Sequence, residues 1–168
     1  NYLPKLIKQG FNVAVCEQTE TAEQAKLNLK KGPLKREVIR VISPGTLTED
    51  NLLERKNNNY LGAISIINGS ISVAWVDVST GYFKSRLIGK ENNSNQKQLL
   101  TNFMLRKDFS EILISDDMDM DYIIDEWRPL IKKQSPSLFH YQSCFDQICS
   151  YYSVVSLEGI GSFSKGEI

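Results

Sequence analysis

Residues 60–88 read YLGAISIINGSISVAWVDVSTGYFKSRLI, and this stretch decides the fold class of the chain. β-Branched and aromatic residues alternate here with small or polar ones, which is typical of strands that have two different faces. Two turn sequences interrupt the pattern, Asn68-Gly69 and Ser79-Thr80-Gly81, and Asn-Gly is a strong signal for a tight hairpin. The stretch therefore predicts an antiparallel meander of three strands, over residues 60–68, 70–78 and 81–88.

The sequence after this meander predicts helices on either side of one more strand. Leu99, Leu100, Phe103 and Met104 recur at helical spacing within residues 96–107. A short apolar run predicts a buried strand, and two later segments have helical patterns; these lie at residues 111–115, 120–132 and 145–155. Three meandering strands followed by helix, strand and helix is the ribonuclease-H-like order of elements. We therefore expect an α/β fold with a mixed sheet flanked by helices, and Trp75, Phe83 and Trp127 in its core.

The sequence before the meander predicts a smaller, separate unit. Residues 11–16 and 37–42 have strand patterns, and helices are expected before Gly10 and over residues 21–29. The turn Ser43-Pro44-Gly45-Thr46 closes this part, after which the chain becomes polar and charged. We therefore expect a first unit at residues 1–46, a linker at 47–58 and a second unit at 59–168.

The overall charge balance hides an asymmetry between these parts. The chain has 20 Lys and Arg and 20 Asp and Glu, for a formal net charge of zero. Residues 1–46 hold eight of the basic and four of the acidic side chains, so the remainder holds 12 basic and 16 acidic ones. A split of this kind suggests two units with different partners.

The cysteine and histidine content argues against a metal site or a disulfide framework. Cys16, Cys144 and Cys149 form no C-x-x-C pair, and His140 is the only histidine. Cys16 ends a strand pattern and is expected to be a small buried residue rather than a nucleophile. No apolar run approaches the length of a membrane span, and no signal peptide is recognisable. We expect a cytoplasmic protein without a membrane segment.

Five short strings, in this order and at this spacing, closely resemble the MutS family of DNA mismatch-repair proteins. They are VAVCEQ at 13–18, REVIRVISPGT at 36–46, NLL at 51–53, NYL at 59–61 and WVDVSTG at 75–81. The resemblance implies that residues 1–46 are the C-terminal half of the mismatch-recognition domain, or domain I. It implies that residues 59–168 are most of the ribonuclease-H-like connector domain, or domain II, with its last helix cut short. We therefore expect an excised fragment of a larger protein.

The resemblance also implies a function for the full-length protein. A MutS homodimer binds mispaired duplex DNA, exchanges ATP with the help of Mg²⁺, and signals repair through a MutL-type partner. The family's mismatch-reading Phe-x-Glu motif is expected upstream of Asn1 and its ATPase domain far downstream, and no P-loop string occurs in this sequence. This fragment is therefore expected to be no enzyme and to hold no cofactor of its own. Its expected part is DNA-backbone contact and coupling between domains and partners.

Four basic residues are the candidate contacts to the DNA backbone: Arg36, Lys35, Lys31 and Lys30. They lie around a Gly-Pro turn and at the start of a strand, where flexible cations suit phosphate oxygens. In the resemblance, Arg36 takes the place of a basic residue near the DNA. The alternative interpretation is that this basic run is an ordinary solvent-exposed surface.

Two alternatives to DNA recognition remain open. Asp77, at a strand end before a Ser-Thr-Gly turn, could hold Mg²⁺ together with Glu111 in a ribonuclease-H-like nuclease. The competing interpretation is that Asp77 caps the turn by accepting backbone hydrogen bonds. The acidic run from Asp116 to Glu126 is expected to complement a helix N-terminus. The other alternative is a purely structural connector with no DNA contact.

Overall fold

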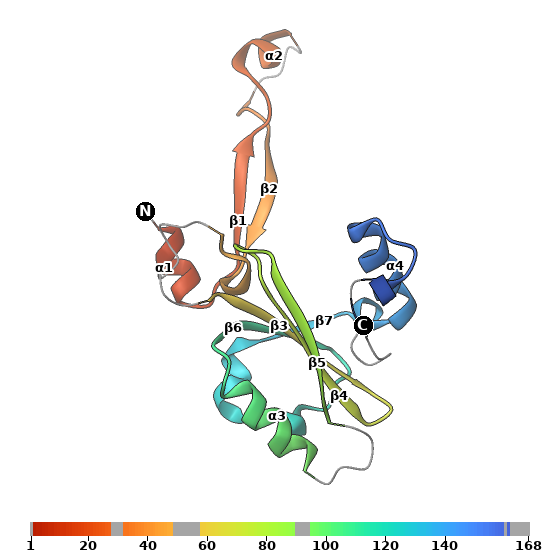
Figure 1. Ribbon diagram of the computed structural model, residues 1–168. Coiled ribbons are helices and arrows are strands. Elements are labelled where there is room, and N and C mark those ends of the chain that lie inside the picture. The colour runs from red at the N-terminus through yellow and green to blue at the C-terminus, as the bar shows by residue number, and fades with distance from the viewer. Residues whose placement is uncertain (1, 28–31, 49–57, 90–94, 160, 162–168) are drawn as a thin grey trace. The chain divides into compact units, whose positions relative to one another are not determined.

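The computed structural model describes residues 2–27, 32–48, 58–89, 95–159 and 161. It divides into two units, Asn1–Pro44 and Gly45–Ile168 (Figure 1). The predicted first unit ended at residue 46, while most of the predicted linker, 47–58, lies outside the described residues. The assignment of the two units to domain I and the connector stays a prediction. No helix among the described residues is long and apolar enough to cross a bilayer.

Unit 1 is a two-stranded antiparallel ribbon with two short helices. In chain order it contains α1 (Leu3–Lys8), β1 (Val13–Gln18), α2 (Ala22–Leu27) and β2 (Arg36–Ile42). The ladder runs from the pair Val13–Ile42 to the pair Gln18–Arg36, with an irregularity between Val15 and Cys16. Within these two strands only Ile42 is buried. The ribbon therefore exposes both of its faces.

Side-chain hydrogen bonds to the backbone hold the described residues on either side of residues 28–31, between β1 and β2. The Thr21 N–H donates to Gln24 Oε1 at 2.9 Å, and the Gln24 N–H donates to Thr21 Oγ1 at 3.2 Å. This reciprocal pair is a capping box, and it sets the start of α2. Next to it, the Glu20 carboxylate is buried and accepts from the Lys35 N–H at 3.1 Å. The start of β2 is therefore held in place.

Unit 2 is built on a five-stranded mixed sheet with strand order β5-β4-β3-β6-β7. Its strands are β3 (Tyr60–Ile67), β4 (Ser70–Asp77), β5 (Tyr82–Gly89), β6 (Phe109–Ser115) and β7 (Ile131–Gln134). Its α-helices are α3 (Gln96–Met104) and α4 (Tyr141–Tyr152), and its short 3₁₀ helices are η2 (Met120–Tyr122), η3 (Asp125–Leu130), η4 (Pro136–Phe139) and η5 (Leu157–Gly159). A further one, η1 (Pro44–Thr46), lies where the two units divide.

Antiparallel and parallel pairing meet at β3, which makes the sheet mixed. β3, β4 and β5 form the predicted antiparallel meander, whereas β6 and β7 add to β3 in parallel. The predicted α/β class and the mixed sheet with flanking helices are confirmed. The observed strand order is compatible with the ribonuclease-H-like arrangement.

One face of the sheet carries the main core, and we call it the core face. It presents Ile64, Val73, Trp75, Ile112 and Ile114, all buried, with Ile64, Val73 and the two β6 isoleucines at 0% exposure. Leu100 and Met104 of α3 pack against it, as does Trp127 of η3. Burial of this apolar surface is the main stabilising term for unit 2.

We call the opposite side the α4 face. Its residues include Leu61, Ala63, Ser65, Ser72, Ala74, Glu111 and Leu113, which alternate with those of the core face along each strand. A cavity of about 310 Å³ lies between small side chains of this face and α4. α3 therefore packs on the core face, and α4 lies on the other side of the sheet.

The predicted helix over residues 120–132 is wrong. The chain forms η2 and η3 there, and β7 begins at Ile131 and pairs in parallel with β6 from Ile112. Ile124 between the two short helices is extended, at φ −76° and ψ 154°, and Pro129 inside η3 has no N–H to donate. The predicted helix at 145–155 is present as α4, but it begins earlier, at Tyr141.

Two predicted burial states are also wrong, and both have a topological reason. Cys16 is exposed, because it lies in the two-stranded ribbon of unit 1, which is exposed on both faces. Phe83 is 41% exposed, because it pairs with Val76 and so lies on the α4 face rather than in the core. Trp75 and Trp127 are buried, as predicted.

Candidate nucleic-acid interface

Two of the four predicted DNA-backbone residues lie in the described part of the chain. Lys35 directly precedes β2 and Arg36 begins it. Lys30 and Lys31 lie outside the described residues, so their place stays a prediction. Of the four residues, the structure therefore shows the exposure and the neighbours of Lys35 and Arg36 only.

Lys35 and Arg36 are neighbours in sequence but lie on opposite faces of the ribbon. Arg36 pairs across the ladder with Gln18, and Glu37 pairs with Glu17. The ladder continues past the strand end, because the Thr19 N–H donates to the Lys35 carbonyl oxygen at 3.0 Å. Since side chains alternate along a strand, Lys35 shares a face with Glu37, and Arg36 lies on the other.

The Lys35 charge is balanced by a neighbouring carboxylate. Lys35 Nζ lies 2.6 Å from Glu37 Oε1, and both side chains are more than half exposed. The hydrogen bond and the opposite charge raise the pKa of Lys35 above its ordinary value and lower the pKa of Glu37. A phosphate that binds Lys35 would therefore meet a cation that is already paired with Glu37.

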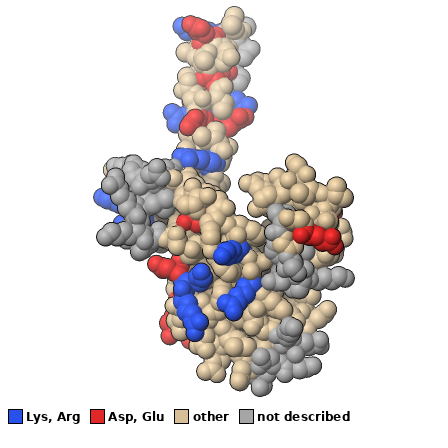
Figure 2. All heavy atoms as spheres, in the orientation of Figure 1, with Lys and Arg blue, Asp and Glu red and all other residues tan. Residues whose placement is uncertain are grey.

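Arg36 is presented differently. Its side chain is exposed, and within the described residues no ion pair involves it. Its face of the ribbon also carries Gln18, Cys16 and Val38, which are uncharged. Figure 2 shows basic and acidic side chains interspersed along the ribbon. The guanidinium of Arg36, with its five donors, is the more available cation for a phosphate.

Asp77 has the role of a turn cap. The Ser79 N–H donates to Asp77 Oδ1 at 3.0 Å, and the Ser79 hydroxyl donates to the same oxygen at 2.6 Å. The carboxylate is 3% exposed and closes the turn between β4 and β5. These bonds confirm the interpretation that Asp77 caps the turn.

Glu111 does not converge with Asp77. Glu111 lies beside Leu61 on the α4 face, whereas Asp77 lies opposite Tyr60 on the core face. β3 separates their strands, and the two side chains leave the sheet on opposite faces. A two-metal site needs carboxylates that converge from one side on ions about 4 Å apart. The described residues contain no group of three His, Cys, Asp or Glu that could hold a metal ion. The geometry argues against the alternative of a Mg²⁺ site shared by Asp77 and Glu111.

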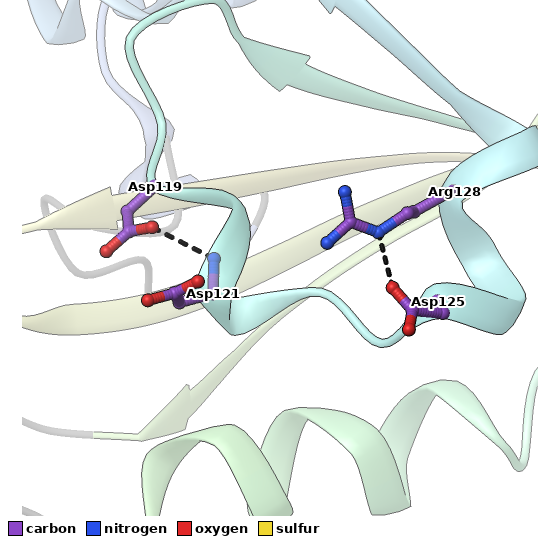
Figure 3. Close-up of polar contacts among 4 residues, drawn as sticks. All are labelled: Asp119, Asp121, Asp125 and Arg128. Carbon is purple, nitrogen blue, oxygen red and sulfur yellow. Dashed lines mark hydrogen bonds and ion pairs between the residues drawn. The ribbon is translucent and has the colours of Figure 1, made fainter.

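The acidic run after β6 is used in local contacts. Asp119 accepts from the Asp121 N–H at 2.9 Å at the start of η2, and Asp125 pairs with Arg128 Nε at 2.6 Å (Figure 3). Asp116 lies 3.5 Å from Lys133 Nζ. These carboxylates cap a short helix and form exposed ion pairs, and such pairs contribute little to stability.

Comparison with known proteins identifies the class of the chain. Residues 1–51 match the family model described as MutS domain I. Over its whole length the chain is 37% identical to the DNA mismatch repair protein MutS of Anaplasma phagocytophilum (strain HZ), covering 20% of that protein. It is 38% identical over its whole length to the MutS of Wolbachia pipientis wMel and 36% identical to that of Bartonella henselae, covering 19% and 18% of them.

The chain therefore belongs to the MutS family. It spans about a fifth of the length of these relatives. The family resemblance inferred from the five sequence strings is confirmed, and so is the reading of the chain as part of a MutS protein.

Proposed function

We propose that this chain is the part of a mismatch-recognition protein that joins a DNA-contacting unit to a connector. Unit 1 contributes backbone contacts through Arg36, supported by Lys35, Lys31 and Lys30. The observation that carries the proposal is the exposed guanidinium of Arg36 on an uncharged face of the ribbon, in a segment that matches MutS domain I.

The roles of the full-length protein follow from the same proposal. As a homodimer it binds mispaired duplex DNA, and ATP with Mg²⁺ in a domain outside this chain drives its change of state. Unit 2 transmits that change and offers part of the surface for a MutL-type partner. The chain itself carries out no catalysis, and the full-length protein acts in the cytoplasm.

The test of DNA contact is the salt dependence of binding to a mismatched duplex. Arg36→Ala removes one phosphate contact and is expected to lower the slope of log K against log salt by about 0.9. Lys35→Ala is expected to have a smaller effect, because Glu37 already balances that charge. Arg128→Ala is the matched control, since it removes one exposed cation that pairs with Asp125 in unit 2.

Two outcomes would contradict the proposal. Equal losses in Arg36→Ala and Arg128→Ala would show a nonspecific effect of net charge. No DNA binding at any salt concentration would favour the purely structural connector. The nuclease alternative has its own test, because Mg²⁺-dependent DNA cleavage that Asp77→Asn abolishes would support it.

The partner role needs a separate experiment. A photo-crosslinker placed at single exposed positions of unit 2 is expected to capture a purified MutL-type protein from some positions and not from others. Crosslinks confined to unit 1, or none from any exposed position of unit 2, would contradict the partner role without affecting the DNA proposal.

A further inference from the structure

Three cations of unit 2 each lie over an aromatic ring. Lys107 Nζ lies 4.9 Å from the centroid of the Trp75 ring and 5.4 Å from that of Tyr60. Arg86 and Lys84 of β5 have the same kind of contact, with Phe103 at 5.9 Å and with Tyr82 at 5.2 Å. Contacts of this geometry hold a flexible cation in place through the ring quadrupole.

The rings themselves are neighbours, so the three cations belong to one cluster. The ring centroids of Trp75 and Phe103 are 5.4 Å apart, and those of Tyr60 and Tyr82 are 6.4 Å apart. Lys107 touches one ring of each pair and so connects them. We call the seven residues the basic-aromatic cluster: Tyr60, Trp75, Tyr82, Lys84, Arg86, Phe103 and Lys107.

The charges of this cluster are not balanced by carboxylates. Among the described residues no ion pair involves Lys84, Arg86 or Lys107. Asp77 lies opposite Tyr82 in the ladder, but this residue is buried and its carboxylate is bonded to Ser79. The cluster therefore holds two exposed cations, Lys84 and Arg86, and the half-buried Lys107, in a unit that is acidic as a whole.

The cluster lies at an edge of the sheet that a long ligand can reach. β5 is an edge strand, and its side chains Lys84 and Arg86 are both exposed on the core-face side. Two residues along a strand span about 6.8 Å, so the two cations form a row rather than a point. Figure 2 shows basic side chains gathered over the part of unit 2 that contains β5.

Cations in a row beside an exposed ring suit a nucleic-acid strand. Tyr82 is 42% exposed and stands in the same row, two residues before Lys84. Phosphates bind the cations, and a ring beside them can stack on a base, which is the combination found in strand-binding grooves. A cation already held by a ring loses less side-chain entropy when a phosphate binds.

We propose that the basic-aromatic cluster is a second nucleic-acid contact, which binds the phosphodiester backbone of DNA independently of Arg36. An acidic protein segment would meet the same charges but would make no use of the exposed Tyr82 ring. A basic surface that is merely solvated would bind neither DNA nor an acidic protein segment. The proposal goes beyond the contact assigned to unit 1.

The experiment measures DNA binding by the whole chain with fluorescent oligothymidine and a duplex of the same length. The variant Lys84→Gln/Arg86→Gln/Lys107→Gln is made in the Arg36→Ala background, which removes the contact of the proposed function. We expect affinity for oligothymidine at about 0.1 M salt to fall by roughly tenfold to a hundredfold. The salt slope is expected to fall by about 2, at about 0.7 for each phosphate contact on a single strand.

The matched control is Lys97→Gln/Lys132→Gln/Lys133→Gln, which removes the same charge from other parts of unit 2. It is expected to leave the affinity and the salt slope near those of the Arg36→Ala chain. Urea unfolding of each variant separates a loss of binding from a loss of fold. Tyr82→Leu keeps every charge, and we expect it to weaken binding to oligothymidine more than to duplex.

Three results would overturn the proposal. One is an equal loss of binding in the cluster variant and in the control. Another is polyglutamate competing with DNA as well as oligothymidine does, which would assign the cluster to an acidic protein. The third is loss of all binding in Arg36→Ala alone, which would leave the proposed function standing and remove the second contact. If instead only the cluster variant weakens binding, the proposal for Arg36 fails and this one stands.

Discussion

Asp77 and Glu111 lie on opposite faces of the five-stranded sheet of unit 2. Asp77 is opposite Tyr60 in the ladder of β3 and β4, and Glu111 is beside Leu61, the next residue of β3. Each carboxylate accepts a hydrogen bond from a backbone N–H, Asp77 from Ser79 and Glu111 from Gly45. Each therefore fixes a different turn of the chain, and the sheet separates them.

The turn after β4 is expected to depend on Asp77. Asp77→Ala removes the acceptor of both Ser79 bonds. Because a hydrogen bond of this kind contributes about 0.5–1.5 kcal/mol, we expect the loss of both to cost about 1–3 kcal/mol. Asp77→Asn keeps an oxygen at the same place and is expected to cost less. Urea unfolding followed by tryptophan fluorescence measures both, since Trp75 lies in the same strand.

Ser79→Ala is the control for this prediction. It removes the 2.6 Å hydroxyl bond but leaves the 3.0 Å bond from the Ser79 N–H. We expect the stability of Ser79→Ala to lie between that of the wild-type chain and that of Asp77→Ala. A stability of Asp77→Ala equal to that of the wild-type chain would refute the turn-cap role.

Magnesium is expected to leave the stability of this chain unchanged. A ligand that binds only the folded state stabilises it by RT ln(1 + [L]/Kd), so the melting temperature rises with ligand concentration. Because the Asp77 and Glu111 carboxylates share no site, titration with Mg²⁺ should give no such rise. A Mg²⁺-dependent rise in the melting temperature that disappears in Glu111→Gln would contradict the geometry and revive the nuclease alternative.

Local pattern predicted the meander well and the segment before β7 poorly. The strands over residues 60–88 are specified by alternation and by two turns, which are both local properties. Residues 120–132 have apolar spacing compatible with a helix, yet Ile131 joins β6 through a parallel ladder. Parallel pairing joins residues distant in sequence, so a short window cannot detect it.

The same distinction applies to the candidate contacts. That Lys35 and Arg36 point to opposite faces follows from strand alternation, and the sequence contains that signal. The basic-aromatic cluster has no comparable signal, because Lys107 comes from beyond α3 and meets Tyr60 and Trp75 only in the folded unit. The net charge of the second unit is negative, so it gave no indication of this local basic cluster.

Gly45 is expected to tolerate no larger residue. A Cβ atom there would lie 2.9 Å from Glu111 Cβ and 3.0 Å from Leu61 Cδ1, both closer than ordinary contact. Gly45→Ala is therefore expected to destabilise unit 2 by about 1–3 kcal/mol, as overpacking does. Gly159→Ala is the matched control, because a Cβ atom there meets nothing within 4 Å.

The measurement is urea unfolding of both alanine variants beside the wild-type chain. Gly159→Ala is expected to leave the unfolding midpoint close to that of the wild type. Equal midpoints for all three proteins would mean that the approach of Gly45 to β3 and β6 is looser than the distances indicate.

The Lys35–Glu37 pair makes a prediction about pH. The pKa of Glu37 is lowered by its hydrogen bond to Lys35 and by the Lys35 charge, so the folded chain favours the ionised carboxylate. The stabilising contribution is present above the ordinary carboxyl pKa, and it is lost as pH falls through the lowered pKa of Glu37. For Lys35 the pKa is raised, so its contribution is present below the ordinary amine pKa and is lost as pH rises through the raised value.

Titration of the Glu37 carboxyl by NMR tests this directly. In Lys35→Ala we expect the Glu37 pKa to rise toward its ordinary value, whereas Lys26→Ala, which removes a cation of the same unit outside this pair, should leave it unchanged. Salt at 1 M should also raise it, because the Debye length then shrinks to about 3 Å and the pair is exposed. A Glu37 pKa that does not respond to Lys35→Ala would mean that the pair does not persist in solution. Lys35 would then be as available to a phosphate as Arg36 is.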